Sequence, residues 1–233
     1  MLKRTLSMIC CLFFLQGCTQ DQELKKEIES MEKQLLTATE QKDTNTVLSL
    51  IQQGANINVT DNQGRTPVMI ATYGNDIKTA RTLIKAGANV NIQDKMKNNP
   101  FLYTGAEGYL EILKLSIDAG ADPTLTNRYG GTALIPAAEH GYIDVIKELL
   151  TRTNIDVNHV NNLGWTALME AIVLSDGTEI QQQVIRLLIE HGANINIPDH
   201  DGVPPLQHAR AHNFKEIEEI LIQVGAQESN IYK

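Results

Sequence analysis

The sequence predicts an all-α solenoid built from about six stacked pairs of short helices, because one pattern returns about every 33 residues. Its clearest copy runs from Gly64 to Asn91 and ends in Gly-Ala-Asn-Val-Asn. That ending returns at Gly54, Gly120 and Gly192, and its beginning returns at Gly131 and Trp165. Only 5% of the 233 residues are aromatic. This composition suits small helices that pack through alanine and leucine.

The N-terminus predicts a targeting segment over residues 1–17. Lys3 and Arg4 precede a mostly apolar run, Leu6–Leu15, which is too short to span a bilayer comfortably. Leu15-Gln16-Gly17-Cys18 then resembles the lipobox of bacterial lipoproteins. That resemblance implies cleavage before Cys18, a lipid on its thiol and sorting to the outer membrane facing the periplasm. An ordinary signal peptide followed by a chance cysteine is the alternative.

Cysteine usage and charge narrow the functional class. Cys10 and Cys11 lie in the segment to be removed, so the mature chain would hold no free thiol, which suits an oxidising periplasm. The net charge of −8 becomes two units more negative once Lys3 and Arg4 are gone. A nucleic-acid binder needs a basic stripe, so no nucleic-acid partner is expected.

The N-terminal part of the mature chain is expected to be a tether that leads into a helix. Residues 18–29 form the lipidated tether, and residues 30–229 form the repeat domain. Leu24, Ile28, Met31 and Leu35 recur at helical spacing. The first repeat, at about 30–58, lacks the Thr-Pro-Leu pattern, as a terminal cap would. Initiation at Met31 would give a form without the lipid.

The second and third repeats show the pattern and a departure from it. In the second, at about 61–93, Gly64 can take a positive φ, Thr66 can cap a helix and Gly87 can end one. In the third, at about 94–126, Lys97 replaces the glycine and Thr104-Gly105 replaces Ala-Ala. We expect the lowest local stability in this third repeat.

The last three repeats, at about 127–160, 161–198 and 199–229, vary in length. The fourth has a second helix that is one residue longer than its neighbours and ends without glycine. The fifth contains an insertion, Ser175–Thr178, which we expect to lengthen the turn between its helices by about five residues. The sixth forms a C-terminal cap, and residues 230–233 are a short tail.

The repeat pattern resembles that of the ankyrin family over about residues 30–229. That resemblance implies short finger hairpins, and a concave groove lined by the finger tips and the exposed side of each first helix. The groove positions give these expected partner-binding residues: Arg65, Tyr73, Met96, Glu107, Arg128, Tyr129, Glu139, His140, Leu163, Trp165, Val173, His200 and His212. Met96, Tyr129, Leu163 and Trp165 are large residues at nominally exposed positions. Such residues with a polar rim are typical of binding hot spots, although Trp165 could instead pack between adjacent fingers.

The sequence contains no pattern that predicts catalysis, so no enzyme activity and no cofactor are expected. The Gly-x-Ser-x-Gly, phosphate-loop and His-Glu-x-x-His patterns are all missing. His208 and His212 could face one zinc ion, but no third ligand is evident, and polar groove residues are the favoured interpretation. Glu107, Glu139 and Glu170 recur near the ends of first helices and are expected to form a solvated charge row.

A lipidated ankyrin architecture resembles the immunity proteins that are paired with type VI secretion phospholipase effectors. The resemblance implies a monomeric periplasmic protein that binds an incoming lipase and blocks it. An acidic groove with aromatic anchors would suit a toxin with a basic, membrane-seeking face. The alternative is a periplasmic scaffold that supports an envelope or oxidative-stress enzyme such as catalase.

Overall fold

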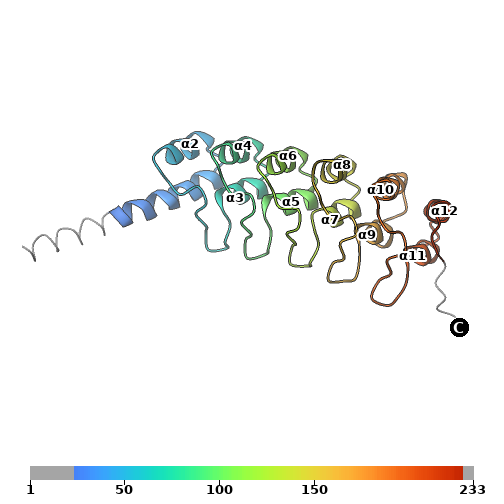
Figure 1. Cartoon of the computed structure of the whole chain (residues 1–233). Coiled ribbons are helices and arrows are strands. Elements are labelled where there is room, and N and C mark those ends of the chain that lie inside the picture. The colour runs from blue at the N-terminus through green and yellow to red at the C-terminus, as the bar shows by residue number, and fades with distance from the viewer. Residues whose placement is uncertain (1–23, 228–233) are drawn as a thin grey trace, which may run out of the picture.

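The computed structural model describes residues 24–227 and shows two layers of helices with a row of finger loops along one edge (Figure 1). The first layer holds a helix over residues 24–40, α3 (Pro67–Tyr73), α5 (Pro100–Glu107), α7 (Leu134–Glu139), α9 (Ala167–Val173) and α11 (Pro205–Ala211). The second layer holds α2 (Thr44–Gln52), α4 (Ile77–Lys85), α6 (Leu110–Asp118), α8 (Ile143–Arg152), α10 (Glu179–Glu190) and α12 (Lys215–Gln223). Residues 24–227 contain no strand, and the all-α class with six helix pairs is confirmed.

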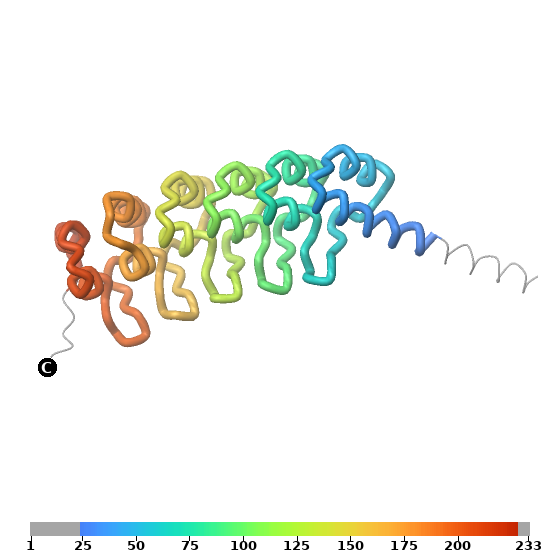
Figure 2. Tube along the Cα trace, turned by 180° about the vertical axis from the view of Figure 1, so that it is seen from behind, coloured from blue at the N-terminus to red at the C-terminus, as the bar shows by residue number. Residues whose placement is uncertain are grey.

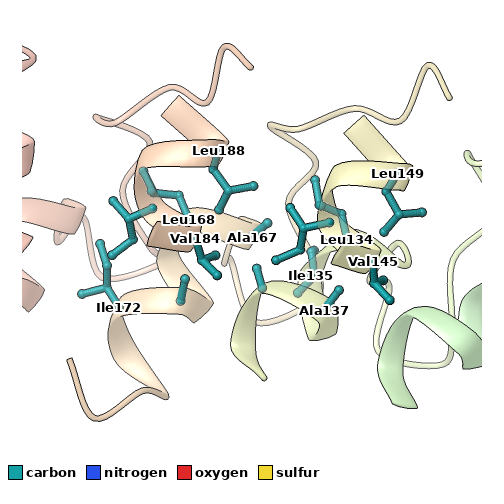
Figure 3. Close-up of a cluster of buried hydrophobic side chains, with 14 of the residues drawn as sticks. Leu134, Ile135, Ala137, Val145, Leu149, Ala167, Leu168, Ile172, Val184 and Leu188 are labelled. Carbon is teal, nitrogen blue, oxygen red and sulfur yellow. The ribbon is translucent and has the colours of Figure 1, made fainter. Parts of the chain in front are cut away.

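Each helix packs on its counterpart in the next repeat, so the stack grows in one direction (Figure 2). In the first layer α5 contacts α3 and α7, and in the second layer α8 contacts α6 and α10. The space between the layers is filled by fully buried side chains such as Leu134, Leu149 and Leu168 (Figure 3). The fold is therefore held by contacts between neighbouring repeats, as in other solenoids.

An Asp or Asn side chain at the start of each finger fixes its shape. The Oδ1 atom of Asp61 accepts hydrogen bonds from the N–H groups of Gln63 and Arg65, at 2.8 and 2.9 Å. The same pair of bonds, to the residues two and four positions later, is made by Asp94, Asn127, Asn161 and Asp199. Short polar side chains favour such turns because they bond to nearby backbone. The residue two positions after the Asp or Asn is thereby held at the tip.

Asparagine side chains join successive repeats on the side of the stack where the second helices end. The Oδ1 atom of Asn91 accepts from the Asp122 N–H at 2.8 Å, and that of Asn158 accepts from the Asn194 N–H at 2.7 Å. Thr124 takes this position in the third repeat and bonds to Asp122 of its own loop instead. The junction between the third and fourth repeats therefore depends on other contacts.

The third repeat keeps its shape despite its unusual residues. Lys97 takes the left-handed conformation of the missing glycine, with φ of 58°. The side chain of Asn99 caps α5 by accepting from the Leu102 N–H at 2.8 Å. A Cβ atom on Gly105 would lie 2.6 Å from the carbonyl oxygen of Ala133, so only glycine lets α5 approach α7 this closely. Gly105 is thus a packing requirement rather than a defect of the helix.

Replacing Lys97 with glycine should stabilise the protein by about 0.5–1 kcal/mol, because a side chain in the left-handed region is strained and glycine is not. Urea unfolding of the variant and the wild type measures the difference. Gly64 has the same place in the second finger, with φ of 77°, so Gly64→Ala is the matched control and should destabilise. A Lys97→Gly protein less stable than the wild type would contradict this view of the third finger.

Several local predictions are confirmed and two need correction. Thr66 caps α3 by accepting from the Met69 N–H, and Gly87 follows α4 with φ of 94°. With ten residues α8 is one residue longer than α6, as expected, but it is shorter than α10, which has 12. The inserted residues Ser175–Thr178 do lie between α9 and α10, but this turn, residues 174–178, is only two residues longer than the turn 140–142 between α7 and α8. The rest of the added length is in α10, which has 12 residues.

The second correction concerns the tether. Residues 24–29, expected to belong to it, are helical and continue directly into the first repeat. The helical stripe is present, but its side chains are exposed at Leu24 and Ile28 and fully buried only at Leu35. The predicted signal segment, Cys18 and the tail at 230–233 lie outside the described residues.

Candidate functional site

Three consecutive finger tips present large apolar side chains to solvent. Met96, Tyr129 and Leu163 are 44%, 54% and 55% exposed, and we call these three residues the tip row. The corresponding tips of the second and sixth repeats carry Gln63 and Asp201, so the apolar character is confined to the middle fingers. A monomeric protein has no structural reason to expose three such neighbours, which marks the tip row as a candidate binding surface.

Arg128 connects the first two members of the tip row. Its guanidinium carbon lies 4.6 Å from the centre of the Tyr129 ring, and its Nη1 atom lies 3.7 Å from the sulfur of Met96. A cation over an aromatic ring is attracted by the negative face of the ring. Arg128 therefore orders the tips of the third and fourth fingers as one surface.

A pocket of about 320 Å³ opens beside this surface, between the fourth and fifth fingers. Its walls come from α5, α7, α9 and both fingers, and its lining residues are Ala106, Asn127, Tyr129, Gly131, Ile135, Pro136, Glu139, Asn161, Leu163, Glu170 and Leu174. Three expected site residues, Tyr129, Glu139 and Leu163, are thus brought together. Most of the lining is apolar, and the carboxyl groups belong to Glu139 and Glu170.

Glu170 is the residue whose role the sequence interpretation missed. It was expected in a solvated row, but it is only 6% exposed. The reason is its position: Glu170 lies in the first turn of α9, whereas Glu107 and Glu139 are the last residues of α5 and α7. Burial, reinforced by the negative charge of Glu139, raises the pKa of Glu170 to about 7, although a hydrogen bond from Asn161 acts in the opposite direction.

A spacing of nine residues could have revealed Glu170. Asn161 closes the fifth finger, and its Nδ2 donates to Oε1 of Glu170 at 2.7 Å. In the sixth repeat Asp199 has the same place, and its Oδ2 lies 2.7 Å from Nε2 of His208, again nine residues later. In both repeats the finger side chain and the helix side chain nine residues later form a donor–acceptor pair. A glutamate nine residues after the finger asparagine therefore indicates a carboxyl group held at the finger base.

A second pocket, of about 460 Å³, adjoins the first and shares Glu139 and Leu174 with it. The inserted residues of the fifth repeat, including Ser175 and Asp176, form part of its wall. Gln181 also lines it, and this side chain donates from Nε2 to the carbonyl oxygen of Glu139 at 2.7 Å. Its Oε1 atom is buried without a hydrogen-bond partner. The fifth repeat therefore holds a buried acceptor that no group of residues 24–227 satisfies.

Two expected site residues are engaged within the stack itself. The Tyr73 hydroxyl donates to Oδ2 of Asp94 at 2.6 Å and accepts from Nδ2 of Asn98 at 3.0 Å. Burial and the neighbouring Asp94 carboxylate raise its pKa to about 12. Arg65 is bound to Asp61 at 2.6 Å. These side chains stabilise the second and third fingers, so less of their hydrogen-bonding capacity is left for a partner.

The remaining expected residues lie around the pockets or away from them. His140 is exposed and lines the second pocket, whereas Glu107 and His200 are exposed outside both linings. Val173 and Trp165 are only partly exposed. Trp165 follows the finger glycine, and its backbone N–H donates to Oδ1 of Asn161 at 3.0 Å.

The zinc alternative gains no support from the geometry. Nε2 of His208 is used by Asp199, and the ring of His212 stacks on Phe214 with 5.2 Å between the ring centres. Across residues 24–227 no group of three His, Cys, Asp or Glu side chains is placed to hold a metal ion. The helices of that same part of the chain are also too short or too polar to cross a membrane.

Comparison with known proteins agrees with this architecture. A family model described as ankyrin repeats in three copies matches residues 5–94 and 101–199. The chain belongs to the ankyrin-repeat family. The stack is therefore a protein-interaction scaffold, and the paired fingers and helices described above are ankyrin repeats.

The ankyrin stack is similar to several bacterial proteins. A solved ankyrin-repeat domain from Acinetobacter baumannii is 47% identical, covers 83% of this chain and 98% of its own, and has a TM-score of 0.81. A putative ankyrin repeat protein of Escherichia coli K12 is 51% identical over 80 residues, 34% of this chain. One from Rickettsia felis is 34% identical over 85 residues, 36% of this chain. The matches span 40% and 21% of those two relatives.

The buried carboxyl group of Glu170 should make stability depend on pH. Its pKa is about 7 in the fold and near 4.5 in the unfolded chain. The folded state binds the extra proton between these values, so stability falls as pH rises through that window. Across that window we expect the free energy of unfolding of the wild type to fall by up to about 2 kcal/mol more than that of Glu170→Gln. Urea unfolding from about pH 4.5 to 8 measures both proteins.

The control is Glu190→Gln, which removes the same charge from an exposed place on α10. Its unfolding free energy should follow that of the wild type over the whole pH range. If the curves of wild type and Glu170→Gln ran parallel, the carboxyl group would not titrate near neutral pH.

Proposed function

We propose that this ankyrin protein is a lipid-anchored binding protein of the bacterial envelope that neutralises a type VI secretion phospholipase effector. The observation that carries the binding role is the tip row beside an acidic pocket. Exposed Tyr129 and Leu163 flank the opening, and Glu139 and Glu170 lie within. Exposed aromatic and aliphatic anchors around a concave site are what protein interfaces use for most of their affinity.

Charge supports a basic partner. The chain has a net charge of −8, and the two carboxyl groups of the pocket face a partner that approaches the tip row. Complementary charges accelerate association and exclude wrong partners. A phospholipase that works on anionic membranes presents a basic face to them, and this is the face that an acidic groove would cover. Blocking it would separate the enzyme from its substrate without any chemistry by the ankyrin stack.

The anchor in this proposal is Cys18. The lipobox resemblance supports its acylation, and the helix over residues 24–40 would begin shortly after the membrane surface. The repeats would then stand in the periplasm, where an incoming effector reaches its lipids. A protein held there needs only one copy to intercept one effector molecule.

The partner is tested with a type VI phospholipase effector, taken first from any such gene that adjoins the gene for this chain. Purified lipase and purified ankyrin protein are mixed, the complex is measured by calorimetry, and phospholipid hydrolysis is followed on vesicles. We expect a one-to-one complex in which hydrolysis stops. Unchanged hydrolysis at saturating ankyrin protein would refute the immunity role. Peroxide sensitivity of a deletion strain that still tolerates toxin-bearing neighbours would instead identify the scaffold.

The anchor is tested separately by Cys18→Ser. Cells that make the wild type should label it with radioactive palmitate and retain it in the outer-membrane fraction. The variant should take up no label and leave that fraction. Equal labelling of the two proteins would contradict acylation at Cys18, whatever the partner proves to be.

A further inference from the structure

We propose that the pocket between the fourth and fifth fingers receives an arginine side chain of the protein partner. This inference rests on the proposed binding function and specifies the chemistry of its central contact. The pocket combines an apolar entrance with two carboxyl groups, which match the stem and the head of an arginine side chain.

The entrance suits the methylene stem of arginine. Tyr129, Leu163 and Leu174 are each about half exposed and line the pocket, and Ile135 lies among its buried lining residues. Long cationic side chains bury their aliphatic stems along such walls while the charged head continues to a polar site. A carboxylate or phosphate ligand would gain nothing from this wall and would be repelled by Glu139 and Glu170.

The carboxyl groups suit the charged head. Glu139 lies at the end of α7 and Glu170 in the first turn of the adjacent α9, so both reach the same cavity. Burial, reinforced by the negative charge of Glu139, raises the pKa of Glu170 to about 7, so Glu170 is partly protonated at neutral pH. An incoming cation would relieve that repulsion, because an opposite charge favours the ionised form of both groups. In the free protein Glu139 and Glu170 repel each other, and a bound cation would remove this repulsion.

The second pocket adds an acceptor that has no partner. Oε1 of Gln181 is buried and unpaired, and the donation from Nε2 to Glu139 fixes which end of the amide is the oxygen. An unsatisfied buried acceptor costs stability, and this one lies beside the adjoining pocket, which shares Glu139 and Leu174 with the proposed arginine site. Gln181 lies three residues after the insertion Ser175–Thr178, and three of the inserted residues line the same second pocket as Gln181.

Arginine fits better than lysine because of the shape of its head. Its planar head carries five donors, which can serve carboxyl groups that approach from two helices, whereas an ammonium group acts as a compact point charge. The Tyr129 ring is already occupied by the guanidinium group of Arg128, so the incoming head is expected at the carboxyl groups and not on this ring. The other titratable groups facing the two pockets are His140 and Asp176.

The test uses two small probes on the purified chain. Nα-acetyl-arginine methylamide carries the proposed side chain, and the citrulline counterpart has nearly the same shape without the charge. Amide signals of the chain are followed by NMR during titration at pH 7. We expect saturable shifts at Tyr129, Asn161 and Glu170 with the arginine probe, and binding at least about tenfold weaker with citrulline. Equal binding of both probes, or shifts elsewhere on the stack, would overturn the proposal.

Two variants connect the binding to the carboxyl group. Glu170→Gln keeps the shape of the side chain and should weaken the arginine probe about tenfold, because a charged hydrogen bond is replaced by a neutral one. Glu190→Gln should leave the affinity unchanged. Equal affinity of wild type and Glu170→Gln would remove the carboxyl group from the contact. A lysine probe that binds more tightly than the arginine probe would also contradict the proposal.

The outcomes separate this inference from the proposed function. If the lipase forms its complex but the arginine probe does not bind, the pocket assignment fails and the immunity role stands. If the arginine probe binds in the pocket but no lipase is captured, the pocket is real and the partner has been misidentified.

Discussion

Replacing both Tyr129 and Leu163 with alanine should weaken partner binding about 100-fold. Both side chains are more than half exposed, so their loss should leave the fold intact. At an interface the same side chains become buried, and truncating such an anchor typically costs about 2 kcal/mol or more. The effect is expected mainly in the dissociation rate, because interface contacts form after the encounter. Calorimetry or surface plasmon resonance with the proposed phospholipase effector measures it.

A matched control removes two equally exposed apolar side chains from another part of the stack. Ile222 and Val224 at the end of α12 are 49% and 46% exposed. The double alanine variant there should bind like the wild type. Losses of equal size in both double variants would mean that general surface hydrophobicity, and not the tip row, determines affinity.

Gly105→Ala should destabilise the protein by about 3 kcal/mol, even though alanine favours helices more than glycine does. The added Cβ would lie 2.6 Å from the carbonyl oxygen and 3.0 Å from the Cα atom of Ala133. These are backbone atoms that cannot rotate away, so α5 and α7 would have to separate. The two apolar clusters of the core meet at this repeat, since Ile112 belongs to one and Leu113 to the other. A shift of α5 would therefore disturb the buried core as well. Urea unfolding measures the loss.

Gly131→Ala is the control for this prediction. Gly131 lies at the same junction, but the nearest side-chain atom to its added Cβ would be 3.6 Å away, an ordinary contact. The variant should change stability by less than about 1 kcal/mol. A Gly105→Ala protein as stable as Gly131→Ala would show that the close approach of α5 and α7 can relax freely.

The fold was predictable because the same residue pattern recurs in successive repeats. A glycine after the finger, a threonine cap and a closing Gly-Ala-Asn agree with one another in the second repeat, and the copies fix the period. Local chemistry and global stacking therefore point to the same answer. The third repeat was harder, since Gly105 looks like a weak helix residue until the position of Ala133 is known.

The site was predictable in part. Met96, Tyr129 and Leu163 were identified because a finger tip is polar by default and large apolar residues there need a reason. Trp165 was assigned to the same surface, and its side chain is only partly exposed where that of Leu163 is exposed. Both residues donate their backbone N–H to Asn161, so the difference depends on what packs against each side chain, which the identity of the residue alone does not reveal.

Glu170 and Gln181 show where sequence reasoning stops. A glutamate on a short helix is normally solvated, so the sequence signal for the burial of Glu170 was its spacing of nine residues from Asn161, which the repeat pattern does not emphasise. Gln181 lies in α10 after an insertion of irregular length, so no repeat register predicts what its amide meets. Burial and unpaired acceptors arise between elements, and the pattern within one element does not contain them.

Hydrogen exchange on the lipase complex tests the central claim most directly. The account predicts slower exchange of backbone amides in the third, fourth and fifth fingers, around Met96, Tyr129 and Leu163, and in α9. Amides of the second-layer helices α4, α6 and α8 should exchange as in the free protein. Protection confined to those helices, with unchanged exchange in the three fingers, would place the partner on the opposite face and contradict the account.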